Sequence, residues 1–162
     1  MSVENKINKI TILISQIQNN NTKLSIAKGW MLIHNTDPKL EKIINKLSVL
    51  SFHILDVLIS HQELTGIKIA ELLGVTRGGV SRAIQKLQNE ELIITIQHDN
   101  NKKNIYYQLT SKGQKIGHLH QKMHTKLYKQ IQTKISNNFS VKELDIIIKF
   151  LTDIKDYEEQ LK

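Results

Sequence analysis

The stretch that decides the fold runs from residue 66 to residue 85 and reads GIKIAELLGVTRGGVSRAIQ. Its apolar residues recur where two short helices would pack on each other, at Ile69, Leu73, Val75, Val80 and Ala83. Ala70 is small where the two helices cross, and Gly74 falls where the turn between them needs a positive φ. Each position meets a packing requirement, so the stretch predicts a helix-turn-helix.

Both arginines of the chain, Arg77 and Arg82, lie in the second of these helices, whereas lysine carries the positive charge elsewhere. A guanidinium is a planar fork of donors that fits guanine edges and phosphates. We therefore expect the outward face of this helix to contact double-stranded DNA. The residues predicted to contact DNA from this helix and its cap are Thr76, Arg77, Gly78, Ser81, Arg82, Gln85 and Lys86.

Within that set, Arg77, Gly78 and Ser81 are the expected base readers, since the first turns of a recognition helix meet base edges. Gly78 and Gly79 are poor helix formers that cost about 1 kcal/mol each relative to alanine. We interpret the two glycines as allowing close approach of the backbone to DNA.

Two alternating segments follow the helix-turn-helix, at residues 92–96 and 105–109, with a polar turn at 99–104 between them. A two-stranded hairpin directly after a recognition helix is a wing. Asn101, Lys102 and Lys103 are placed at its tip, where they are predicted to reach phosphates or the minor groove. Thr65 and Lys68, at the start of the first helix, are further candidates for phosphate contacts.

The remaining chain is predicted to be helical, with starts at Asp37-Pro38, at Ser48 or Ser51, at Thr110 or Ser111, and at the capping box Ser140–Glu143. The expected fold is mainly α with a small β-hairpin. A winged helix-turn-helix lobe (48–110) is flanked by dimerisation helices (1–47 and 111–162), all within one structural domain. The apolar stripes of the terminal helices exceed what one small domain covers, which predicts a homodimer.

The composition excludes several classes of protein. The formal net charge of +8 favours polyanionic partners, and residues 65–115 hold eight basic and four acidic residues. Cysteine is absent, so there is no disulfide framework or thiolate site. The N-terminus lacks the pattern of a signal peptide, and no apolar run reaches the roughly 18 residues of a membrane span. These features favour a cytoplasmic protein without a membrane partner.

From about residue 48 to 161 the chain resembles MarR-family winged helix-turn-helix regulators. The match rests on FHIL (52–55), IAELLGV (69–75), VSRAI (80–84) and YQLTSKG (107–113). The resemblance implies a homodimer that usually represses transcription from a pseudo-palindromic operator and often releases DNA on binding a small ligand. In one respect the chain departs from the family. Asn101 and Lys103 stand where family wings commonly carry Asp-x-Arg, so a bidentate brace is missing.

Three of the seven histidines, His53, His120 and His124, resemble the zinc-site histidines of zinc-responsive members of the family, and equally a pattern in its fatty-acid-synthesis repressors. His120 and His124 are four residues apart, which suits two imidazoles on one metal. The sequence places no anionic ligand beside them, so zinc is possible but a buried structural histidine cluster is favoured. An acyl chain or other apolar effector between Trp30, Met31 and Phe52 is the remaining hypothesis.

Two other functions compete with that of a DNA-binding regulator. A winged helix that binds protein instead of DNA is the alternative, although such a module has no need of a cationic face with paired arginines. An enzyme is not expected. The chain carries no Gly-rich phosphate loop, no paired acids in motif spacing and no nucleophile–base signature.

Overall fold

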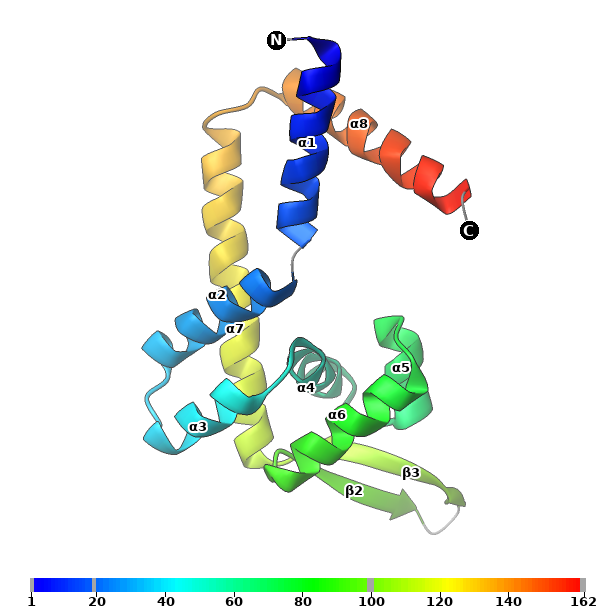
Figure 1. The fold of residues 1–162 in the computed structure, drawn as a ribbon. Helices are drawn as coiled ribbons and strands as arrows, with labels where there is room; N and C mark the ends of the chain where they lie inside the picture. Colours follow the sequence, from blue (N-terminus) through cyan, green and yellow to red (C-terminus); the bar gives the residue numbers. More distant parts are fainter. Residues whose placement is uncertain (1, 19, 99–100, 161–162) are drawn as a thin grey trace. The chain divides into compact units, whose positions relative to one another are not determined.

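The computed structural model describes residues 2–18, 20–98 and 101–160 (Figure 1). The chain forms two compact units, Met1–Met123 and His124–Lys162. The elements in order are α1 (Val3–Gln18), α2 (Asn20–His34), α3 (Pro38–Lys46), α4 (Val49–His61), β1 (Glu63–Thr65), α5 (Gly66–Leu73), α6 (Arg77–Asn89), β2 (Ile93–His98), β3 (Asn101–Leu109), α7 (Ser111–Ser136) and α8 (Val141–Gln160). Helix α7 begins in the first unit and ends in the second.

The helix starts follow from local side-chain chemistry. Asp37 Oδ1 accepts a hydrogen bond from Lys39 N at 3.0 Å, with Pro38 in the first position of α3. The hydroxyl of Ser48 accepts from Ser51 N at 3.1 Å, which settles Ser48 as the N-cap of α4. These caps confirm the predicted starts, because a cap depends only on residues within one turn.

Two further caps lie in the other half of the chain. The hydroxyl of Thr110 accepts from Gly113 N at 3.1 Å, so Thr110 caps α7. Ser140 and Glu143 form the expected capping box at the start of α8, with Ser140 N donating to Glu143 Oε2 at 2.8 Å.

The core of the first unit is built around α4, which contacts α5, α6, β1 and β3. Phe52, Leu55 and Leu58 of α4 are almost completely buried, as are Ile69 of α5 and Leu87 of α6. Burying one such side chain contributes about 1.5–3 kcal/mol. The helix-turn-helix is therefore held as one body with the helix before it.

The sheet has three strands in the order β1-β3-β2, all antiparallel, where the sequence predicted a two-stranded hairpin. The added strand, β1, pairs Leu64 with Tyr107 and sits between α4 and α5. Three residues are too few for an alternating pattern, which is why the sequence did not predict β1. The predicted turn at 99–104 is also shorter, because β3 already begins at Asn101.

The end of α6, the start of β2 and the start of α7 meet in one junction of the first unit. Leu92 O accepts a hydrogen bond from Thr110 N at 3.0 Å, and Thr110 Oγ1 donates to Glu91 O at 2.8 Å. Lys112 Nζ donates to Glu90 O at 2.9 Å. Gly113 packs so closely that an added Cβ would lie 2.0 Å from Leu92 O. The helix-capping motif at 110–113 thus also fastens α7 to the recognition helix.

Within the described ranges, no single helix is long and apolar enough to cross a membrane. The consecutive helices α3 and α4 meet that test of length and composition only as a pair, across a bend of 117°.

Candidate nucleic-acid interface

The helix-turn-helix forms as its sequence predicts, except that Val75, which was expected to pack, is 39 % exposed. Thr65 caps α5, and Gly74 ends it with a φ of 62°, a left-handed conformation that glycine adopts without steric cost. Val75 N donates to Ala70 O at 3.1 Å, which closes the turn. Thr76 then caps α6 by accepting from Gly79 N at 3.3 Å. The turn fixes where the outward face of α6 begins.

Helix α6 separates its side chains into a buried face and an exposed face. Val80, Ala83, Ile84 and Leu87 are buried against the rest of the first unit. Arg77, Gly78, Ser81, Arg82 and Gln85 are exposed, and Lys86 is half-buried. The expectation that these six residues share the face opposite the packed side therefore agrees with the structure.

The two arginines diverge across this exposed face. Successive residues of a helix are turned by about 100°, so Arg77 and Arg82 are separated by about 140° around the helix axis. On the same projection Gln85 lies near the middle of this interval, and Gly78 lies within it but closer to Arg82. The exposed face of α6 thus forms a ridge, with Arg77 on one side, Arg82 on the other side and Gly78 between them.

Gly78 and Gly79 have different surroundings. An added Cβ on Gly78 would meet nothing within 4 Å. On Gly79 it would lie 3.2 Å from Thr76 Oγ1, the atom that caps the helix, and 3.7 Å from Leu50 Cδ2. Gly79 therefore has a packing reason within the chain itself. Gly78 has none among the described residues, and the interpretation as close approach to DNA rests on Gly78 alone.

A wing-side hollow of about 550 Å³ lies between α5, α6 and β3. Thr65, Lys68, Arg77, Ser81 and Asn104 are among its lining residues. Lys68 makes an ion pair with Glu71 at 3.1 Å, and both side chains remain exposed. The predicted phosphate-contact residues Thr65 and Lys68 thus line the same hollow as Arg77.

The wing is tied to the rest of the first unit by polar contacts. Gln88 Nε2 of α6 donates to Thr95 Oγ1 of β2 at 2.8 Å, and His98 Nε2 lies 2.8 Å from Glu63 Oε1 of β1. The backbone of residues 101–103 forms the start of β3. The side chains of Asn101, Lys102 and Lys103 lie outside the described residues, so their predicted contacts stay predictions.

The histidines do not form the buried cluster that the sequence predicted. His120 is buried at 3 % exposure, but His53 and His124 are exposed. His120 stacks on Phe52 with ring centroids 4.9 Å apart, and its ring lies 6.1 Å from that of His53. His124 follows His120 one turn later on α7. Because His120 and His124 are four residues apart, they lie on the same face of α7, but only His120 is buried.

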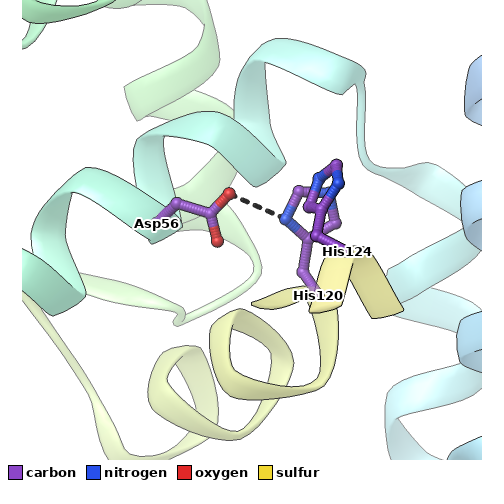
Figure 2. Close-up of side chains that lie close together, drawn as sticks. All are labelled: Asp56, His120 and His124. Carbon is purple, nitrogen blue, oxygen red and sulfur yellow. Dashed lines mark hydrogen bonds and ion pairs between the residues drawn. The ribbon is translucent and has the colours of Figure 1, made fainter. Parts of the chain in front are cut away.

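An anion does lie beside the histidines, so the prediction that none does is wrong. Asp56 Oδ2, from α4, lies 2.8 Å from His120 Nδ1 (Figure 2). The other oxygen, Asp56 Oδ1, is buried and finds no hydrogen-bond partner among the described residues. Asp56, His120 and His124 supply the carboxylate and imidazole donors that zinc accepts. Asp56 follows His53 by three residues, about one turn of α4. This spacing could have predicted a carboxylate near the histidines.

The electrostatics of this region act on His53. Although His53 is exposed, the neighbours that cover part of its ring desolvate it and lower its pKa; the neighbouring charge of His120 lowers the pKa further, and Asp56 opposes the change by raising it. His53 is thereby favoured in its neutral form, with the desolvation of the ring as the largest cause.

The residues predicted to hold an apolar effector are placed in packed surroundings. Met31 and Phe52 are buried in the core at 0 % and 1 % exposure. Trp30 stacks on His34 with ring centroids 3.8 Å apart. Their role in binding an effector stays a prediction.

Comparison with known proteins gives consistent matches. The model of the MarR family matches residues 47–105. The chain is 35% identical to the transcriptional regulator AdcR of Streptococcus pneumoniae over 103 residues, which are 62% of this chain and 67% of AdcR. It is 32% identical to the HTH-type transcriptional regulator PchR of Bacillus subtilis over 105 residues, 64% of this chain. That match spans about three fifths (61%) of the length of PchR.

Solved structures agree with the sequence matches. A cysteine-to-serine variant of ZitR from Lactococcus lactis in complex with DNA aligns with a TM-score of 0.70 and 29% identity, over 97% of this chain and 98% of that one. A second ZitR structure, of a zinc-responsive MarR family member, aligns with a TM-score of 0.62 and 28% identity, over 69% and 76% of the two chains. AdcR of Streptococcus pyogenes, an adhesin competence repressor, aligns with a TM-score of 0.60 and 28% identity, over 74% and 88%.

Proposed function

Because this chain belongs to the MarR family, we propose that it is a sequence-specific DNA-binding transcriptional regulator, and a repressor, without catalytic activity. The observation that carries the proposal is the exposed ridge of α6 with Arg77 and Arg82 on its two sides. An α-helix fits the major groove, where a guanidinium can bind a guanine edge bidentately. ZitR binds DNA in its solved structure, which favours DNA over a protein partner for this ridge.

The proposed active species is a homodimer that acts in the cytoplasm on a pseudo-palindromic operator. Helix α8 has no buried residue, and Ile146, Ile148 and Tyr157 are each more than 60 % exposed. On α1, Ile12 and Ile17 are exposed to a similar degree. Soluble monomers rarely expose such apolar surface, and a second copy of the same chain would cover it symmetrically.

The proposed control of DNA binding is a small effector. Zinc is possible at the histidines but not favoured. Zinc is not favoured because Asp56 Oδ2 already makes a hydrogen bond with His120 Nδ1. The same hydrogen bond would orient His120 as a ligand through Nε2 if a metal bound, since metal-ligating imidazoles commonly donate their other N–H to a carboxylate. A structural role for the Asp56–His120 pair is the favoured proposal.

The test of the proposed function selects duplexes from a random DNA library with the wild-type protein and measures their binding by fluorescence anisotropy. Arg77→Ala should relax base preference at one position of each half-site, with a loss of about 1–3 kcal/mol of discrimination. Arg82→Ala is the matched probe on the other side of the ridge. Lys122→Ala, on an exposed position of α7, removes a charge outside the helix-turn-helix and serves as the control. Equal binding by both arginine variants and the wild type would refute the proposal.

A further inference from the structure

A second hollow lies against α6, on the side away from the wing. This α3-side hollow, about 340 Å³, is lined by Lys46 at the end of α3, by the first residues of α4, and by Gly79, Arg82 and Lys86 of α6. Residues 79, 82, 83 and 86 of α6 face it, whereas residues 77, 80, 81 and 84 face the wing-side hollow. At about 100° per residue, these two sets point in nearly opposite directions.

The basic side chains around the α3-side hollow come from two separate elements. Lys46 Nζ lies 3.0 Å from Glu90 Oε1, and Lys86 Nζ lies 3.8 Å from the same oxygen. Glu90 is 14 % exposed, but the lysine side chains are 54 % and 43 % exposed. Arg82 makes no ion pair among the described residues. Lys46 and Lys86 thus share one carboxylate, and with Arg82 beside them a net positive charge faces solvent.

The position of this charge points to a ligand. A helix in the major groove, about 12 Å wide, lies between two walls of phosphates. The wing-side hollow faces one wall, and the opposite side of α6 must face the other. Contacts to phosphates fix the register of a recognition helix and carry no base information. Lys46 is outside the helix-turn-helix and the wing, and no sequence pattern singles it out as a DNA contact.

We propose that Lys46, together with Arg82 and Lys86, binds a backbone phosphate of double-stranded DNA on the groove wall opposite the wing. This site rests on the proposed function, since it requires α6 to enter the major groove. Glu90 pairs with Lys46 and Lys86 and offsets part of their charge, but it is not required for the phosphate contact. The recognition helix is then held between two phosphate contacts, one on each side.

The experiment measures the affinity of wild type and Lys46→Gln for a selected duplex and for an unrelated duplex across a series of salt concentrations. Each phosphate contact contributes about 0.9 to the slope of log K against log salt. Lys46→Gln should reduce that slope by up to about 0.9 per subunit and weaken binding by up to about eightfold per subunit near 0.1 M salt, because Arg82 and Lys86 remain beside the phosphate. The loss should be equal for both duplexes. Lys122→Gln, with the same change of charge, should alter neither slope nor affinity.

A second variant separates phosphate binding from a structural ion pair. Glu90→Gln breaks both ion pairs but keeps both lysine cations, so the salt slope should stay as in wild type or steepen. If Lys46 acts only through Glu90, then Glu90→Gln will weaken binding as much as Lys46→Gln, and the site is refuted. A wild-type protein that binds DNA while Lys46→Gln keeps its slope overturns this site alone. A wild-type protein that binds no duplex overturns the proposed function as well.

Discussion

Gly113 offers the sharpest test of how the first unit is held together. An added Cβ at this position would lie 2.0 Å from Leu92 O, 3.0 Å from Leu92 C and 3.2 Å from Leu109 Cδ2. Carbon–oxygen contacts of this kind normally measure about 3.3–3.6 Å, so alanine requires a displacement of about 1.3 Å. Leu92 O cannot yield easily, because it accepts the hydrogen bond from Thr110 N.

The effect of Gly113→Ala on stability is the difference between the free-energy cost of overpacking and the gain in helix propensity. Overpacking of a well-packed site typically costs about 1–3 kcal/mol, and here the obstacle is backbone. Alanine gains up to about 1 kcal/mol over glycine in a helix. Because the backbone obstacle places the cost in the upper part of that range, at about 2–3 kcal/mol, we expect a net loss of about 1–2 kcal/mol in the free energy of unfolding. For a chain of this size that lowers Tm by about 2–8 °C.

Two other helical glycines calibrate the measurement. Gly117→Ala would place its Cβ 2.5 Å from Ile59 Cδ1, the end of a flexible side chain that can turn away, so its effect should be smaller. Gly78→Ala meets nothing within 4 Å and should raise Tm slightly. Thermal melts at equal protein concentration give the order. If Gly113→Ala melts at or above wild type, or if Gly117→Ala is the more damaging, then the close packing of α7 on Leu92 is not what limits this position.

Two further predictions concern the histidine region. The pKa of His53 is lowered in the folded chain, so its contribution to stability is present above about pH 6.5 and declines as the pH falls through the folded pKa. His53→Asn should therefore lessen the drop in Tm between pH 7.5 and 5.5, and an unchanged drop would contradict this. His120→Ala removes a buried ring and leaves Asp56 without its partner, and should destabilise the chain by about 2–4 kcal/mol with no change in metal content. Stoichiometric zinc in the purified native protein that is lost in His120→Ala would instead establish a metal site.

The sequence was sufficient where the structure depends on neighbouring residues. The caps at Asp37, Ser48 and Thr76 and the left-handed turn at Gly74 each involve contacts within a few positions, so composition and spacing predict them. The buried face of α6 follows for the same reason, because the helical period alone separates it from the exposed face.

The sequence was insufficient where partners come from distant parts of the chain. Asp56 reaches His120 across 64 positions, and Lys46 reaches Glu90 across 44. Strand β1 exists because β3 offers it an edge, and not because three residues have a pattern. The exposure of His53 and His124 likewise depends on what surrounds each helix, which periodicity does not report.

The junction at residues 90–92 and 110–113 determines how a signal can travel through the first unit. Thr110, Lys112 and Gly113 are all bonded to, or packed on, the backbone that ends α6 and begins β2. A tilt of the first turn of α7 would therefore strain these contacts unless the end of α6 moved with it. This junction gives a ligand that reorients the first turn of α7 a direct mechanical connection to α6 and β2.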